Sequence, residues 1–371
     1  MLGLLLLCGG CKKPQASATR EQAQAPTRLA RIDTHMHIDP RAIERTLALM
    51  DRWGIDGAVN LSGMSPGPPR FALETQLEAA AQAKGRIAVF ATPAITAILR
   101  QFPEAYGTVM AEQLAEAKRL GAMGLKITKG LGLGYPTPDG KGLLAVDDPG
   151  LDPLFDKAGE LGMPVAIHTG DPQAFWRKPD QDNERLDELM AHPQWSLYGE
   201  PVASWEALFA AFERRVARHP KTTFIGVHFG NAPEEPQRVA AMLDKYPNYV
   251  VDTAARVPEL GRHDAETMRA FFIKYQDRIL FATDTGVGET QAEMMYGSTG
   301  AEPATAADEV RFFTSTYRYF ESRDKQFEHP TAIQGRWKID GLGLPADVLR
   351  KLYFENAARV LRWRPPVAAG P

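Results

Sequence analysis

The stretch that decides the fold is RIDTHMHIDP, residues 31 to 40. It places His35 and His37 two positions apart in an otherwise apolar, strand-like run, and Asp33 stands two residues before the first of them. Residues two apart in a strand point to the same face, so the two imidazoles are expected to face the same side. Taken alone, this pair fits hydrogen-bonded core histidines as well as metal ligands, so its meaning depends on the rest of the chain.

Short β-rich runs alternate with helix-like segments after residue 30. The runs cover residues 30–38, 56–63, 86–94, 123–130, 163–171, 222–231, 248–256 and 278–286. Between most of them lie amphipathic segments, such as residues 72–85 and 108–122, with apolar residues at helical spacing. Repeated strand–helix units predict parallel strands with right-handed crossovers, and eight of them predict an α/β fold of the (β/α)8 TIM-barrel type. An open doubly wound sheet is the alternative, although no glycine-rich G-x-G-x-x-G turn follows the first strand.

Two connections are much longer than the others. Residues 170–221 follow the fifth expected strand, and residues 285–343 follow the eighth. Both would therefore emerge at the C-terminal face of the barrel, where such folds bind their substrates. Residues 344–363 have apolar residues every three to four positions and predict a closing helix.

Polar side chains gather at the C-terminal ends of the expected strands. They are His35 and His37 on the first, Lys126 on the fourth, His168 on the fifth, His228 on the sixth and Asp284 on the eighth. Strand alternation would place His228 on one face with Phe224 and Gly226, and Asp284 with Leu280 and Ala282. Polar groups at the ends of apolar strands are costly unless they are paired or liganded, and a divalent cation would be a common partner for all of them.

Each of these residues has a plain structural explanation when taken alone. A histidine in a strand is usually a core residue, Asp284 fits a helix cap, and Lys126 fits a solvated or salt-bridged lysine. The ordered set together predicts a metal site. The only cysteines are Cys8 and Cys11, so the folded body has no thiolate ligands. Imidazole and carboxylate ligands suit zinc first, with iron, nickel or manganese as alternatives.

The remaining histidines are expected in surface or loop positions. They are His192 and His219, which precede prolines at apparent helix ends, and His263 and His329, which lie in polar segments.

Composition excludes some classes of partner. Of the 371 residues, 44% are hydrophobic and 24% are charged, which is ordinary for a folded protein, and the formal net charge is −3. No basic stripe indicates binding to nucleic acid or to an anionic membrane surface. A small-molecule substrate is the expected partner, and self-association of the chain stays open.

The N-terminal sequence MLGLLLLCGGCKKPQ, residues 1 to 15, resembles a bacterial lipoprotein signal. This predicts a signal over residues 1–11, a flexible tether over 12–30, the barrel domain over 31–364 and a short tail over 365–371. The protein would then be periplasmic or in the cell envelope, anchored to the membrane by a lipid on Cys11. If the leader does not function, the protein would be cytoplasmic.

Four motifs resemble those of the amidohydrolase superfamily of metal-dependent barrels. They are DTHMH at residues 33–37, PVAIHTGD at 164–171, FIGVHFGN at 224–231 and ILFATDT at 279–285, and NAARVL at 356–361 resembles the family's closing helix. The resemblance covers roughly residues 31 to 361. It is closest to the amidohydrolase-related branch that includes aminocarboxymuconate-semialdehyde decarboxylase.

This resemblance implies a role for each residue of the set. The metal ligands would be His35, His37, His168 and Asp284, and His228 would act on the substrate. Lys126 falls where binuclear members carry a carboxylated lysine. The resemblance therefore leaves open whether the site holds one metal ion or two, with zinc as the first expectation. Asp33 would steady the His35–His37 pair.

The implied activity is hydrolysis of a carbonyl-type bond, such as an amide or a lactone, by metal-activated water. Asp284 would accept the proton of the water, and His228 would hydrogen-bond the carbonyl oxygen. Asp171 and Arg256, in the loops after the fifth and seventh strands, are candidates for orienting the substrate. The alternatives are a non-oxidative decarboxylase with the same metal site, and a lipoprotein that binds metal or solute without catalysis.

Overall fold

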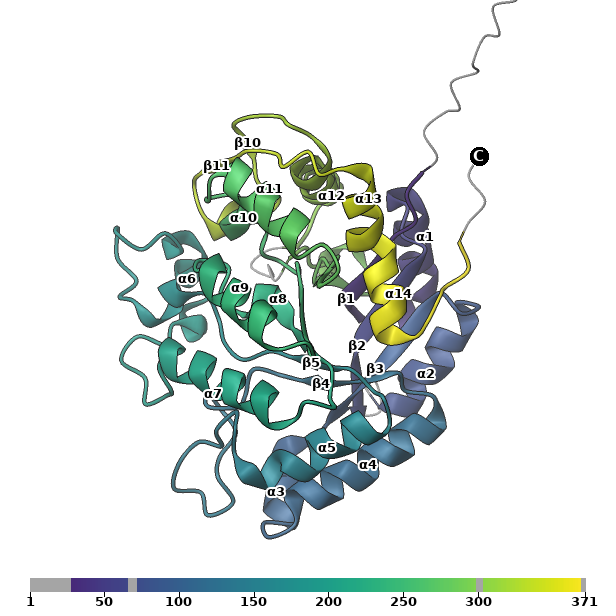
Figure 1. Ribbon diagram of the computed structural model, residues 1–371, viewed down its shortest axis with the longest axis vertical. Helices are drawn as coiled ribbons and strands as arrows, with labels where there is room; N and C mark the ends of the chain where they lie inside the picture. The colour runs from purple at the N-terminus through teal and green to yellow at the C-terminus, as the bar shows by residue number, and fades with distance from the viewer. Residues whose placement is uncertain (1–27, 66–71, 298–302, 368–371) are drawn as a thin grey trace, which may run out of the picture.

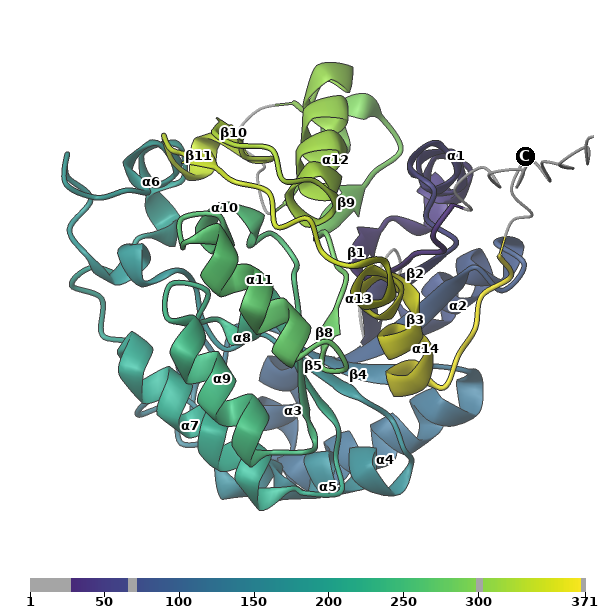
Figure 2. The ribbon, with the colours of Figure 1, turned by 45° about the horizontal axis from the view of Figure 1, so that its top comes forward.

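Parallel β-strands form the centre of the fold, and helices surround them (Figure 1, Figure 2). The computed structural model describes residues 28–65, 72–297 and 303–367. The expected signal, with Cys11, lies outside the described residues, as does all of the expected tether before Arg28. The strands are β1 (Ile32–Ile38), β2 (Gly57–Ser65), β3 (Ile87–Pro93), β4 (Gly124–Ile127), β5 (Val165–Ile167), β6 (Phe224–Gly226), β7 (Tyr249–Asp252), β8 (Ile279–Leu280) and β9 (Thr285–Val287).

The last two strands close the sheet into a barrel. The strand order in the sheet is β8-β7-β6-β5-β4-β3-β2-β1-β9. Strand β8 therefore pairs with β7, while β9, which begins five residues after β8 ends, pairs with β1. At the joint, the Thr34 amide donates to the Phe281 carbonyl at 3.0 Å and the Asp284 amide donates to the His35 carbonyl at 2.8 Å. Residues 279–287 therefore act as one interrupted eighth strand, and the expected TIM-barrel fold is confirmed.

The expected amphipathic segments form the outer helices. These are α1 (Ile43–Trp53), α2 (Leu73–Gln82), α4 (Tyr106–Leu120), α5 (Asp152–Glu160), α7 (Trp205–Arg218), α9 (Pro236–Lys245), α11 (Ala265–Lys274) and α12 (Ala306–Glu321). Shorter helices are α3 (Ile95–Gln101), α6 (Leu186–Ala191), α8 (Val227–Gly230) and α10 (Val257–Leu260). The chain closes with α13 (Ala346–Arg350), the π-helical turn η8 (Lys351–Glu355) and α14 (Asn356–Leu361). None of the helices in the described part of the chain has both the length and the apolar character needed to cross a bilayer.

The two long connections meet beside the C-terminal ends of the strands. The first contains η4 (Gln173–Trp176), α6, η5 (Pro193–Trp195) and α7, and the second contains η6 (Gln291–Glu293), α12, β10 (Phe327–Glu328), η7 (Ala332–Gln334) and β11 (Lys338–Ile339). Helix α6 packs against η7, and Arg336 binds both carboxylate oxygens of Asp187 at 2.8 Å.

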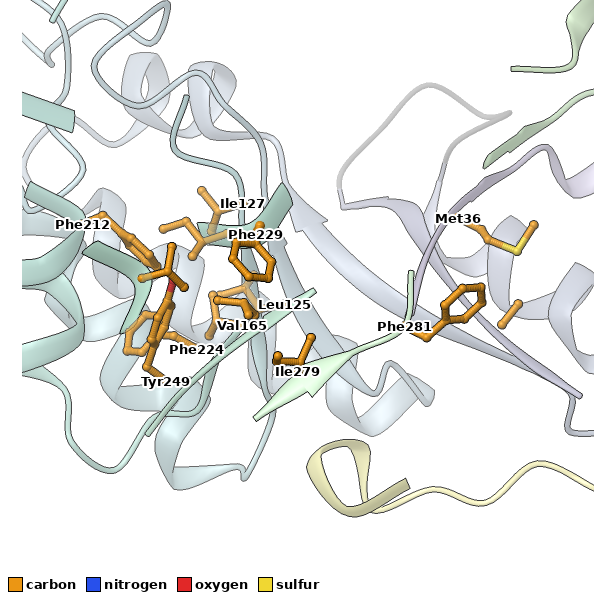
Figure 3. Close-up of a cluster of buried hydrophobic side chains, with 14 of the residues drawn as sticks. Met36, Leu125, Ile127, Val165, Phe212, Phe224, Phe229, Tyr249, Ile279 and Phe281 are labelled. Atoms are coloured by element: carbon orange, nitrogen blue, oxygen red, sulfur yellow. The ribbon is translucent and has the colours of Figure 1, made fainter. Parts of the chain in front are cut away.

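The apolar core has two layers. Inside the barrel, Ile32, Phe90, Ile225 and Leu280 pack together, and Leu361 of α14 closes the end that lies opposite the long loops. The outer layer lies between the strands and the helices, and Figure 3 shows part of it. Residues drawn there include Leu125, Ile127, Val165, Phe224 and Tyr249 from the strands and Phe212 from α7. Since Leu125 and Ile127 belong to the outer layer, alternation along β4 directs Lys126 into the barrel.

A shift in register along β1 changes which of its side chains face into the barrel near the C-terminal end of the strand. Its pairing with β2 is irregular between Asp33 and Met36. Before the irregularity Ile32 packs inside the barrel, and after it Met36 belongs to the outer layer. His35 and His37 flank Met36, so they take the inward face.

We predict that Gly124→Ala destabilises the barrel. A Cβ atom at this position would lie 2.3 Å from the Phe90 ring, in the packed interior. Such overpacking typically costs about 1–3 kcal/mol of unfolding free energy. Urea denaturation monitored by circular dichroism measures this loss of unfolding free energy. Gly134→Ala is the matched control, because a Cβ there would meet no atom within 4 Å, and equal midpoints for the two variants would contradict the packing.

Candidate metal centre

The polar residues of the strand ends converge at one end of the barrel. The Asp284 carboxylate oxygen Oδ1 lies 3.4 Å from Nε2 of His35 and 3.4 Å from Nε2 of His37. The ring centroids of His35 and His228 are 5.0 Å apart, and those of His168 and His228 are 4.4 Å apart. The fold therefore brings these five side chains from four separate parts of the chain into contact.

Each of the four imidazoles is held by a protein oxygen at one ring nitrogen. The contacts are His35 Nδ1 to Asp252 Oδ2 at 3.1 Å, His37 Nδ1 to Ser62 Oγ at 3.1 Å, His168 Nε2 to the Gly170 carbonyl at 2.7 Å, and His228 Nδ1 to the Ala254 carbonyl at 2.9 Å. A carbonyl oxygen only accepts hydrogen bonds, so the nitrogen that faces it carries the proton. The other nitrogen of that ring then keeps the lone pair that a cation needs, an arrangement typical of histidines that bind metals.

Burial sets the protonation states of the cluster. It lowers the pKa of His35, His168 and His228 well below the ordinary value, so these rings are neutral. Burial opposes ionisation of Asp284, but the neighbouring His35 and His37 hold the pKa of Asp284 well below its usual range. Neutral imidazoles and an ionised carboxylate are the forms that bind a metal ion.

The donor set fits a divalent cation. Within the described residues, His35, His228 and Asp284 each offer a ligand atom, and these atoms lie within 4.8 Å of one another. Imidazole nitrogen and carboxylate oxygen are ligands of zinc, and they also serve manganese and iron. Through its free nitrogen, His228 therefore joins the group that could hold metal, and the sequence had suggested for it only a role on the substrate.

Lys126 points at the same cluster. Its side chain is buried, and Nζ has no hydrogen-bond partner among the described residues. Burial lowers the pKa of Lys126 to about 8, although Asp284 and Asp252 favour the charged form. A buried amine without a partner is costly, so this atom fits a site completed by a group from outside the chain. A protonated Lys126 would repel a cation, so this lysine suits a metal centre only in a neutral or carboxylated form.

Two residues of the cluster adopt left-handed backbone conformations. His228 has φ 55° and ψ 44°, and Asp284 has φ 63°. This conformation costs roughly 1–2 kcal/mol for a residue with a side chain, and such strain is common at functional sites. The surrounding hydrogen bonds hold both residues: the His228 amide donates to Asp252 Oδ1 at 2.8 Å, and the Asp284 amide donates to His35.

The expected position of His228 on the strand was wrong. Strand β6 ends at Gly226, and Phe224 faces the outer layer, where its ring lies 5.8 Å from that of Phe155. The left-handed turn after β6 carries His228 into the barrel mouth. Simple strand alternation fails here because the chain has already left the strand.

A cavity of about 400 Å³ opens beside the cluster. His37, His168 and Asp284 line it on the side of the strand ends. The loop after β5 contributes Asp171, Phe175, Glu188, His192 and Trp195, and the loop after β9 contributes Met295. Both long connections therefore take part in the wall, as expected for substrate-binding loops.

Both residues suggested for orienting the substrate, Asp171 and Arg256, line this cavity. The Asp171 carboxylate already pairs with the Lys129 ammonium at 2.8 Å. Arg256 is buried, and its Nη1 donates to the Ala255 carbonyl at 3.0 Å. Within the described part of the chain, no carboxylate forms an ion pair with Arg256.

A family model described as amidohydrolase matches residues 32–363. The chain belongs to the amidohydrolase family. A search of curated proteins by sequence found no match.

Solved structures of similar fold include three bacterial proteins. A dihydroxybenzoic acid decarboxylase from Polaromonas, with bound manganese and the inhibitor 2-nitroresorcinol, is 14% identical, with a TM-score of 0.52 over 90% of this chain and 97% of its own. An amidohydrolase from Burkholderia multivorans with bound zinc is 15% identical, with a TM-score of 0.50 over 90% of this chain and 100% of its own. An uncharacterised TIM-barrel protein from Bordetella bronchiseptica is 16% identical, with a TM-score of 0.50 over 90% of this chain and 99% of its own. At these identities the likeness supports the fold.

In this amidohydrolase, sequence reasoning missed Asp252 at the end of β7. Its Oδ2 contacts the His35 ring, and its Oδ1 accepts from the amides of His228 at 2.8 Å and Ala254 at 3.1 Å. Burial raises the pKa of Asp252 to about 6. The signal was present, since Asp252 is a polar residue ending an apolar strand, as His35 and Asp284 are.

Asp33 acts on the backbone, away from the imidazole rings. Its Oδ1 accepts from the amides of His35 and Thr283, each at 3.1 Å, and its Oδ2 accepts from the Thr283 hydroxyl at 2.5 Å. Burial raises the pKa of Asp33 to about 7 despite these bonds. Asp33 thus ties β1 to the segment next to Asp284.

The other four histidines lie outside helices and strands, in line with the expected surface or loop positions, but three of them are buried. His192, His219 and His329 are buried, and His263 is half-buried. His219 contacts Asp156 at 2.8 Å, and His329 contacts the Gly335 carbonyl at 2.9 Å. A proline after each of the three buried histidines ends regular structure, and the histidines are buried within the loops that follow.

We predict that Asp252→Asn weakens metal binding by about 10- to 100-fold, the usual effect of removing the partner of a ligating histidine. An amide group facing His35 Nδ1 cannot reproduce both contacts of the carboxylate, so the ring loses its orientation. Competition with a chelator for zinc measures the affinity. Asp347→Asn, at an exposed position on α13, is the control, and equal affinities for the two variants would contradict the role of Asp252.

Proposed function

We propose that this amidohydrolase is a metal-dependent hydrolase that cleaves a carbonyl-type bond, such as an amide or a lactone, in a small substrate. The observation that carries the proposal is the set of four imidazoles, each held at one nitrogen by a protein oxygen, that converge with Asp284 at the mouth of a cavity. A purely structural metal site would not need the cavity.

The ion would be held by His35, His37, His168 and Asp284, with His228 as a further ligand or a substrate contact. We propose zinc, with manganese and iron as alternatives, because the donors are nitrogen and oxygen. A cation bound there supplies a nucleophile at neutral pH, because it acidifies water, and it polarises a carbonyl group. A second ion would require Lys126 as a bridging, carboxylated ligand.

Asp284 is placed to move the proton. Its carboxylate is ionised and lies at the boundary between the cluster and the cavity. It can accept a proton from the attacking water and later donate it to the leaving group, as a general base and then a general acid.

Arg256 suits the stabilisation of negative charge better than His228 does. The His228 proton sits on Nδ1, toward the Ala254 carbonyl, so the neutral ring presents a lone pair toward His35 and Asp284. The Arg256 guanidinium is close enough to depress the pKa of His228 further. We therefore propose that Arg256 donates to the substrate oxygen that becomes negative in the transition state.

A non-oxidative decarboxylase is the second candidate. A buried Arg256 without a carboxylate partner among the described residues favours a substrate that brings its own carboxylate. The Polaromonas protein of similar fold is a decarboxylase. Reaction in ¹⁸O-labelled water separates the two: hydrolysis places the label in the product acid, whereas decarboxylation releases carbon dioxide and leaves the product unlabelled.

The N-terminal sequence is the support for a location in the cell envelope. We propose that Cys11 carries the lipid and that residues 12–30 tether the barrel in the cell envelope, where it meets small-molecule substrates.

We predict that Asp284→Asn lowers kcat by about 10²- to 10⁴-fold while the protein stays folded, because the proton acceptor is lost. Initial rates on a panel of lactones and amides measure the loss, and atomic absorption measures the metal that the variant retains. Asp347→Asn serves again as the control. A metal-loaded Asp284→Asn variant with the activity of the wild type would refute the proposal.

A further inference from the structure

His192 lies buried in the cavity wall, and its Nε2 has no hydrogen-bond partner among the described residues. It follows α6 directly and is 8% exposed. Nε2 forms no hydrogen bond within the described residues and is shielded from solvent. Buried polar atoms are rarely left without a partner, and one that lines a cavity is explained when a ligand supplies that partner.

Stacking fixes the orientation of this ring. The imidazole of His192 lies flat on the indole of Trp195, with ring centroids 3.8 Å apart and an interplanar angle of 12°. Trp195 in turn stacks on Phe175 at 6.3 Å and 20°, and its amide donates to the His192 carbonyl at 2.9 Å. The ring is thus preorganised, because it cannot turn freely to find another partner within the loop.

The charges in the cavity indicate what kind of substrate would reach His192. Asp171 pairs with Lys129, and Glu188 accepts from Arg185 at 2.6 Å, so these groups compensate one another. Among the described residues that line the cavity, Arg256 is the cation without such a partner. A substrate that carries a carboxylate would compensate it and would leave its remaining polar groups to meet His192.

We propose that His192 determines specificity by hydrogen-bonding a polar group of a carboxylate-bearing substrate at a point remote from the reacting carbon. The proposal rests on the proposed function, because it takes the cavity as the substrate site. It adds a contact supplied by the loop after β5, whereas the cluster residues come from the strand ends.

Calorimetric titration of the zinc-loaded full chain with benzoate, 3-hydroxybenzoate and 4-hydroxybenzoate tests the contact. The two hydroxylated probes differ from benzoate only in a remote hydroxyl group. In the wild type, the better hydroxylated probe should bind about tenfold more tightly than benzoate, the size of one hydrogen bond. In His192→Phe this preference should vanish, and in His192→Gln it should persist in part. Met190→Ala is the control, since Met190 is exposed on α6, the helix that ends just before His192, and it should keep the preference.

Three results would overturn the proposal: an unchanged preference in His192→Phe, equal binding of all three probes by the wild type, or no binding of any probe. A purely structural role in the ring stack gives the opposite pattern, because phenylalanine keeps the stack and glutamine loses it. Turnover of lactones or amides is a separate readout. Its absence in a wild type that binds with the expected preference contradicts the proposed hydrolysis and leaves the His192 contact standing.

Discussion

The hydrogen bond from the Asp284 amide to the His35 carbonyl closes the barrel and builds the candidate metal centre at the same point. It joins the interrupted eighth strand to β1, and the side chains of the two residues it links lie 3.4 Å apart. Asp33 reinforces the joint through Thr283, and Asp252 connects it to His228. Closure of the sheet and convergence of the ligands are therefore one event, and strain at His228 and Asp284 is held by the surrounding bonds.

Burial sets the protonation states of the side chains in the cluster. It keeps His35, His168 and His228 neutral and depresses the pKa of Lys126, whose amine has no hydrogen-bond partner in the described part of the chain. Such groups are costly inside a protein unless something compensates them. A divalent cation would compensate the ionised carboxylate and take up the free lone pairs, so the cost of burial and the capacity to bind metal would have the same origin. The cavity beside the cluster would then bring a substrate to that cation.

The sequence predicted the fold well because each strand and each outer helix has a strong local pattern. It also predicted the cluster, since polar residues that end apolar strands of one barrel must meet. It failed where the chain departs from regular structure. The register shift in β1 and the left-handed turn at His228 are set by tertiary contacts, which alternation does not show. His192 was not predicted to line the cavity, because its burial depends on how the loop after β5 packs, and no periodicity encodes that packing.

The most direct test of the metal centre is anomalous diffraction from crystals of the zinc-loaded protein, recorded at the zinc absorption edge. We predict a peak inside the cluster that His35, His37, His168, His228 and Asp284 form, where His35, His228 and Asp284 offer ligand atoms within 4.8 Å of one another. A second peak beside Lys126 would show a binuclear site. A folded, zinc-treated protein with no anomalous peak at this cluster would contradict the account.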